Sequence, residues 1–181
     1  IIDKNAGKIH DKVPQVFIPY KEVLDIYDKG LNVPDDVTLM WTDDNYGYIR
    51  RLSDENEQKR KGGAGVYYHI SYWGRPHDYL WLSTTSPALI WSEMNKAYTY
   101  NAREMWIVNV GDLKMMEYNT ELFLDMAWNI DSVNKDNLLL HLQNWAIREF
   151  GERLSKDIAD IMNEYYRLAF LRRPEMMGWS R

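Results

Sequence analysis

Three short apolar segments, each followed by a polar loop, constrain the fold more than any other feature of the sequence. Val37–Thr42 is an almost unbroken apolar run, which is typical of a strand buried on both faces of a parallel sheet. Gly65–Tyr72 and Glu104–Val110 are rich in residues that favour strands. Because helical segments alternate with these runs, the sequence predicts an α/β fold with a parallel sheet. The pattern does not distinguish an open doubly wound sheet from a barrel.

Apolar residues at helical spacing predict the helices. Residues 52–65 are charged and rich in glycine, and they predict a short surface helix followed by a flexible turn. After about residue 130 no further strand is predicted, so we place a domain boundary there, with residues 1–130 before it and residues 131–181 after it. The predicted helices are Tyr20–Lys29, Pro87–Ala102, Glu117–Asn129, Asn137–Phe150 and Glu152–Phe170.

Composition excludes several classes of function. A net charge of −5 argues against a general polyanion-binding surface, so we expect no nucleic-acid partner. The absence of cysteine excludes disulfides and thiol chemistry. No apolar run of about 20 residues predicts a membrane span, so we expect no membrane partner. The 8 Trp and 13 Tyr, against 4 Phe, suit a sugar site and equally a tryptophan-rich core, since both side chains combine a flat apolar face with a polar group.

Polar and aromatic residues follow each predicted strand. In parallel α/β folds the functional site lies at the carboxyl ends of the strands, so we take the candidate site residues from these three loops. They are Asp43, Asp44, Asn45 and Tyr46 in the first loop, His69, Tyr72, Trp73, Arg75, His77 and Asp78 in the second, and Asn109 and Asp112 in the third.

Asp43 and Asp44 are the candidate catalytic residues. Two adjacent carboxylates repel each other, which favours the protonated form of one of them, and a protonated carboxyl group can donate to a glycosidic oxygen. The alternative is an Asp-Asn turn in which the side chains accept hydrogen bonds from the neighbouring backbone. At the end of a buried strand we favour the catalytic interpretation.

For the second loop the sequence allows more than one role for several residues. His69 is either a core histidine or a site residue. His69 and His77 lack the helical i, i+4 spacing of common zinc sites, so we predict no metal. Tyr72 and Trp73 either stack on a sugar ring or pack against protein, and we favour stacking because the loop is otherwise polar.

Two segments, Val37–Thr84 and Arg103–Asn129, resemble glycoside hydrolase family 115. The opening VPQVFIPYKEVLDIYDKG is similar to the same family. The motifs WTDDNYG, YHISYWGRP and NVGDLK, in this order and spacing, are highly specific together. The likeness covers most of residues 13–130 and extends more loosely to the helices beyond.

The resemblance implies an α-glucuronidase that removes glucuronic acid, or its 4-O-methyl ether, from xylan side chains, with inversion and without a cofactor. The expected partner is xylan or a glucuronoxylan oligosaccharide. Residues 1–130 would form the C-terminal half of a (β/α)₈ TIM barrel, and residues 131–181 would begin the helical domain that follows it. Members are often dimeric and in bacteria usually secreted or periplasmic, so a homodimer and such a location are expected.

The chain departs from the family in its length, because members are several times longer and a complete barrel needs about 250 residues. Both ends look cut, so we expect a fragment. An inverting enzyme holds a water between an acid and a base about 6.5–9.5 Å apart, and we expect the partner of Asp43 or Asp44 outside this chain. The candidates for binding the uronic acid carboxylate are Arg50, Arg75, His69 and His77.

The family interpretation assigns Asp43 or Asp44 as the acid or as a direct hydrogen-bonding residue for the sugar. Tyr72 and Trp73 would shape the sugar pocket, and the third loop would bind hydroxyls. Two other functions remain open. One is a non-catalytic carbohydrate-binding protein on the same scaffold. The other is a scaffold in which residues 137–170 mediate dimerisation.

Overall fold

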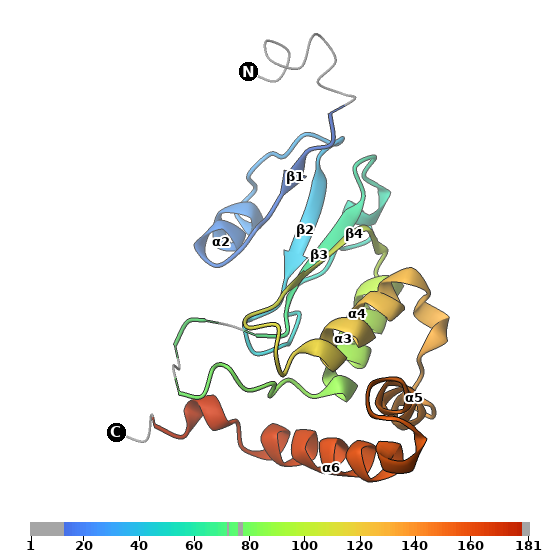
Figure 1. The fold of residues 1–181 in the computed structure, drawn as a ribbon. Coiled ribbons are helices and arrows are strands. Elements are labelled where there is room, and N and C mark those ends of the chain that lie inside the picture. Colours follow the sequence, from blue (N-terminus) through green and yellow to red (C-terminus); the bar gives the residue numbers. More distant parts are fainter. Residues whose placement is uncertain (1–12, 72, 76–77, 179–181) are drawn as a thin grey trace. The chain divides into compact units, whose positions relative to one another are not determined.

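The computed structural model describes residues 13–71, 73–75 and 78–178 (Figure 1). Short 3-10 helices are η2 (Glu57–Lys59), η3 (Ile130–Ser132) and η4 (Pro174–Met176). In chain order the strands and α-helices are β1 (Val16–Phe17), α2 (Glu22–Asp28), β2 (Thr38–Thr42), β3 (Ala64–His69), α3 (Pro87–Thr99), β4 (Ala102–Asn109), α4 (Glu117–Trp128), α5 (Leu138–Phe150) and α6 (Glu152–Leu171).

The predicted elements are confirmed apart from their ends. Each of the three predicted strands is present as β2, β3 or β4, and each of the five predicted helices is present. The short surface helix predicted in residues 52–65 is η2. Sequence analysis missed β1, because a strand of two residues is too short to show an alternating pattern.

The chain divides into two compact units that interleave along the sequence. The first, which we call the sheet unit, comprises Ile1–Thr42, Ile49–Tyr67 and Ala97–Ile107. The second, which we call the helical unit, comprises Asp43–Tyr48, Tyr68–Lys96 and Val108–Arg181. The domain boundary predicted near residue 130 stays a prediction.

The four strands form one sheet in the order β1-β2-β3-β4 (Figure 1). The pairs β1/β2 and β2/β3 are parallel, as the alternation of strands and helices predicted. Leu39, Met40 and Trp41 of β2 are all buried. Because successive side chains of a strand point to opposite faces, both faces of β2 are covered, which is why its sequence is an unbroken apolar run. Closure of this sheet into a barrel stays a prediction.

Gly65 permits a close approach of backbone and side chains inside the sheet unit. A Cβ at this position would overlap the main-chain oxygen of Met105 in β4 and would lie 3.0 Å from the Sδ of Met40 in β2. A residue without a side chain is required wherever another backbone comes this close. Gly65 therefore allows β3 to sit between its two neighbours.

The loop between β2 and β3 is fixed to α2 by Glu57. Its carboxylate accepts a hydrogen bond from the hydroxyl of Tyr27 (2.9 Å) and pairs with Arg51 (2.7 Å). Burial, followed by the hydrogen bond and negative charge of Glu57, raises the pKa of Tyr27 to about 12. The phenol therefore stays protonated and donating throughout the physiological range, which keeps this loop in place.

In the helical unit, α4, α5 and α6 pack around a small aromatic core. Tyr118, Leu142, Ala159 and Tyr166 are its buried members. Gly151, with φ of 82°, joins α5 to α6, and a residue with a side chain would be strained in that conformation. None of the helices in the described ranges combines the length and the apolar character that a membrane span requires.

Polar side chains of this core hold the segment that precedes α3. The Nδ2 of Asn119 donates to the hydroxyl of Ser83 (3.1 Å) and to the main-chain oxygen of Thr85 (2.8 Å). The hydroxyls of Ser83 and Tyr166 are also hydrogen-bonded to each other (3.1 Å). Asn119 is completely buried, so these bonds fix residues 83–85 to α4 and α6.

Candidate functional site

The loop after β2 is a tight turn built by Asp44. Its Oδ1 accepts hydrogen bonds from the backbone N–H groups of Tyr46 (3.0 Å) and Tyr48 (3.1 Å). The loop needs a positive φ at Asn45 (69°) and at Gly47 (91°), which are residue types that tolerate it. The turn that the sequence offered as an alternative is therefore present, and Asp44 forms it.

Asp43 connects this loop to the end of β3. Its side chain is 0% exposed. Its Oδ2 accepts a hydrogen bond from the N–H of Gly47 (3.1 Å), and its Oδ1 accepts one from the backbone N–H of His69 (3.0 Å). The same Oδ1 lies 2.6 Å from Nδ1 of the His69 ring. A carboxylate in this setting orients its neighbours, and its role as a catalytic acid stays a prediction.

His69 is held in one orientation by this pair. Because Asp43 accepts from Nδ1, we assign the ring proton to that nitrogen, which makes Nε2 the acceptor of the neutral ring. His69 is largely buried and lines a cavity at the carboxyl end of β3. A histidine fixed by a buried carboxylate is an arrangement that enzymes use to orient an imidazole toward a substrate.

Tyr68 supports the loop from the opposite side of the strand. Its hydroxyl donates to the main-chain oxygen of Gly47 (2.9 Å). Burial, with a further contribution from the negative charge of Asp43, raises the pKa of Tyr68 well above its usual range, so the hydroxyl remains a donor. A Cβ at Gly47 would lie only 2.9 Å from Cδ2 of Leu89 and 3.0 Å from this hydroxyl. Glycine is therefore required here by packing as well as by φ.

Removing this hydroxyl should loosen the loop. Tyr68→Phe is expected to lower the free energy of unfolding by about 1–3 kcal/mol, because the buried carbonyl of Gly47 loses its donor. Scanning calorimetry would record this as a lower Tm. The control is Tyr100→Phe, which changes an exposed tyrosine in the same way. Equal Tm values for the two variants would show that the bond does not hold the loop.

The loops after β3 and β4 also come together. The backbone N–H of Ile70 donates to the main-chain oxygen of Asn109 (3.1 Å). A Cβ at Gly111 would overlap both Ser71 and the indole of Trp73, so the two segments are in close contact. With the Asp43–His69 bonds, residues from all three predicted loops are joined within the helical unit.

The predicted site residues differ in how they are placed. Asn45, Tyr46 and His69 line the cavity at the end of β3. Trp73 is 60% exposed, and its stacking on a sugar ring stays a prediction. Arg75 and Asp112 are exposed, whereas Asn109 is partly buried. Tyr72 and His77 lie outside the described residues.

The cavity has a volume of about 30 Å³, which is room for one or two water molecules. Several of its polar lining residues were not predicted from sequence. Arg173 and Glu175 reach it from the segment that follows α6, where the pattern Arg172-Arg173-Pro174 indicates only the end of a helix. The other polar residues that sequence analysis missed are Ser71, Tyr79, Thr84 and Thr85.

Arg173 is a cationic residue that lines this cavity. Its Nη2 donates to the main-chain oxygen of Tyr46 (2.6 Å), and its Nη1 pairs with Glu175 (3.2 Å). Its side chain is 12% exposed. Arg50, one of the predicted carboxylate-binding residues, is exposed and belongs to the sheet unit, and its predicted role stays a prediction.

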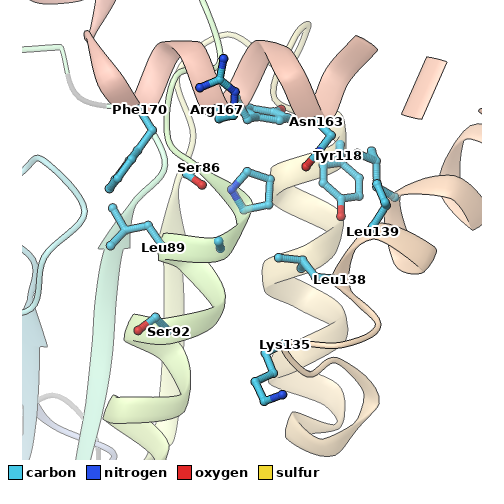
Figure 2. A pocket seen from close by; sticks show the side chains of 14 residues that line it. Ser86, Leu89, Ser92, Tyr118, Lys135, Leu138, Leu139, Asn163, Arg167 and Phe170 are labelled. Atoms are coloured by element: carbon cyan, nitrogen blue, oxygen red, sulfur yellow. The ribbon is translucent and has the colours of Figure 1, made fainter. Parts of the chain in front are cut away.

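Other parts of the helical unit offer a different kind of cavity. One pocket has a volume of about 550 Å³. Leu138 and Leu139 of α5 and Phe170 of α6 are among the residues that line it (Figure 2). None of the predicted site residues lines it. Among the described residues, no group of three or more His, Cys, Asp or Glu side chains is arranged to hold a metal ion.

Comparison with known proteins identifies the family. Residues 1–176 match Glycosyl hydrolase family 115. The chain belongs to glycoside hydrolase family 115. This confirms the resemblance inferred from the WTDDNYG, YHISYWGRP and NVGDLK motifs. No curated protein matched the chain.

A solved structure from family 115 is similar to this chain at 58% sequence identity, with a TM-score of 0.94. It is described as a 4-O-methyl-alpha-glucuronidase with specificity for decorated arabinogalactans. The alignment covers 99% of this chain and 24% of that chain. The present chain therefore spans about a quarter of the length of this family 115 relative.

Proposed function

We propose that this family 115 chain is part of a longer α-glucuronidase that removes glucuronic acid, or its 4-O-methyl ether, from polysaccharide side chains. Family membership and the 58% identity to a 4-O-methyl-alpha-glucuronidase support the reaction class. Residues 1–130 would contribute the C-terminal half of a (β/α)₈ barrel, and residues 131–181 would begin a helical domain. The remaining barrel strands would come from the rest of the longer protein.

The observation that carries the proposal is the buried Asp43–His69 pair, with 2.6 Å between the carboxylate and Nδ1. Asp43 acts as a positioning residue, and His69 presents its other ring nitrogen to the sugar. A fixed imidazole loses no free energy to reorientation when the substrate binds, and it discriminates between hydroxyl positions by geometry.

The residues around this pair would bind the sugar. Asn45 and Tyr46 line the same cavity and supply polar groups. Trp73 offers an exposed indole on which a sugar ring can stack. Asn109, Asp112 and Arg75 lie on the neighbouring strand-end loops and would contact hydroxyls or the uronate carboxylate. Tyr72 and His77, which follow the same strand as His69, keep the sugar-binding roles proposed for them from sequence.

Inversion requires a second carboxylate across a water molecule from the first. Asp44 is the candidate on this chain for one of these two carboxylates, because it is partly exposed, whereas the side chain of Asp43 is completely buried. We propose that the other carboxylate comes from a barrel strand outside the chain. The reaction needs no cofactor, because proton transfer by two carboxyl groups is sufficient for hydrolysis of a glycoside.

The polysaccharide is proposed to be xylan or glucuronoxylan, although the similar structure is described as specific for decorated arabinogalactans. Both polymers can carry the same terminal uronic acid, and contacts beyond that sugar would decide between them. Because such polymers lie outside the cell, we propose a secreted or periplasmic location. We also propose a homodimer, as is common in the family.

The experiment is incubation of the full-length protein with glucuronoxylan and, separately, with a decorated arabinogalactan. Uronic acid is expected to be released from at least one of them. Proton NMR of the earliest product should show the β-anomer, because inversion changes the configuration of an α-linked sugar. Release of the α-anomer first would refute inversion. Absence of uronic acid from both polymers would refute the proposed activity.

A further inference from the structure

Two residues that line the candidate cavity each have one buried polar atom without a hydrogen-bond partner in the described part of the chain. The two atoms are Oε2 of Glu175 and the hydroxyl oxygen of Ser71. Both residues line the cavity of about 30 Å³ that His69 also lines. Buried polar groups are almost always hydrogen-bonded, so two exceptions among the residues that line one small cavity indicate a bound group.

Glu175 is held in place by its other oxygen. Oε1 accepts a hydrogen bond from the hydroxyl of Thr84 (3.3 Å) and lies 3.2 Å from Nη1 of Arg173. The residue is 9% exposed. With Oε1 engaged and the side chain buried, Oε2 is a fixed acceptor that rotation cannot easily turn to solvent.

The chemistry of the two atoms defines what can bind. A carboxylate oxygen only accepts hydrogen bonds, whereas the Ser71 hydroxyl both donates and accepts. A group that donates to Glu175 and accepts from Ser71 must itself be both donor and acceptor. A hydroxyl group meets this requirement, and the cavity has room for it.

We propose that the cavity lined by Glu175 and Ser71 is a hydroxyl-binding subsite beside His69, and that it takes a hydroxyl of the substrate sugar or, in its place, a water molecule. The assignment of this hydroxyl to a substrate sugar rests on the proposed function. Glu175 accepts from the hydroxyl, Ser71 completes its hydrogen bonds, and Arg173 holds both Glu175 and the main-chain oxygen of Tyr46. The segment after α6 thereby becomes part of the candidate site.

The test uses Glu175→Gln, Ser71→Ala and the double variant in the full-length protein. Glutamine keeps the shape and the Oε1 contacts, but it can replace the acceptor Oε2 with a donor. The measurements are inhibition by free glucuronic acid, the separate KM and kcat values for an aldouronic oligosaccharide, and Tm. Glu164→Gln is the control, because Glu164 is an exposed residue paired with Arg167 on α6.

If the subsite takes a sugar hydroxyl, Glu175→Gln should raise KM and the inhibition constant of glucuronic acid about 10-fold or more. Ser71→Ala should raise them by a smaller factor. The double variant should fall short of the product of the two single effects, because both residues contact the same group. A fall in stability alone would not move the inhibition constant in this way.

If water occupies the subsite, the inhibition constant stays unchanged. Both single variants then lower Tm, and the decrease in Tm of the double variant is smaller than the sum of the two single decreases. The proposal would be overturned if the two substitutions acted independently both on the inhibition constant and on Tm. Should Glu175→Gln fail to fold, Ser71→Ala alone decides, because unchanged inhibition and unchanged Tm would exclude a bound hydroxyl. Wild-type protein that releases no uronic acid refutes the proposed function instead, and the Tm comparison still tests the subsite.

Discussion

Asp43→Asn in the full-length protein is expected to lower kcat/KM for release of uronic acid by up to about 10⁴-fold, the loss known for a carboxylate that orients a catalytic histidine. The amide keeps the size of the side chain but removes the negative charge. It also places an N–H group against either the N–H of Gly47 or the ring of His69, both of which now donate to Asp43. The loss is measured as initial rates of uronic acid release, and circular dichroism checks that the variant is folded.

A double-mutant comparison separates positioning from direct catalysis. If Asp43 acts through His69, adding Asp43→Asn to His69→Ala should cause little further loss of kcat/KM. Independent, multiplicative losses would instead favour Asp43 as a direct proton donor. Asp136→Asn is the control for replacement of an aspartate, because Asp136 is exposed and pairs only with the neighbouring Lys135 in the described residues. Wild-type rates in Asp43→Asn would refute both roles.

Gly65→Ala is expected to cause a large loss of stability in the sheet unit. The new Cβ would overlap the main-chain oxygen of Met105, and a backbone atom of a paired strand cannot move aside as a flexible side chain can. We expect the free energy of unfolding to fall by about 3 kcal/mol. This corresponds to a Tm about 6–12 °C lower for the transition of a domain of this size.

Gly30→Ala provides the matched control. Gly30 has φ of +99°, but a Cβ there would meet no atom within 4 Å. That variant therefore measures backbone strain without overlap and should cost about 1 kcal/mol. Calorimetry of the two variants distinguishes the effects. If Gly65→Ala lowers Tm no more than Gly30→Ala does, the close approach of β3 and β4 is not a constraint on this sheet.

Local sequence patterns predicted most of the helices and strands because the burial of each element is visible in its own residues. The run over β2 is apolar without interruption because both faces of the strand are buried, and that cause can be inferred from one segment alone. The helices of the second half show a helical period because only one face of each is buried, which can also be inferred from one segment. β1 was missed because its two residues are defined by pairing with β2 and not by a pattern of their own.

The candidate site was predicted less completely because its contacts join distant parts of the chain. The loops were found from the position of strand ends, but the bonds between Asp43 and His69 span 26 residues and depend on the register of β2 against β3. No rule based on composition or spacing gives that register. Arg173 and Glu175 were missed because the folding of α6 brings them to the cavity, while their own neighbours in sequence indicate only a helix end.

The bond from Arg173 to the main-chain oxygen of Tyr46 has an evolutionary consequence. Every amino acid carries that carbonyl, so substitution at position 46 leaves the attachment intact. The side chain at this position can therefore vary among relatives while the loop retains its shape. Single substitutions at this position therefore change a side chain that lines the cavity without removing a bond of the Asp43–His69 pair.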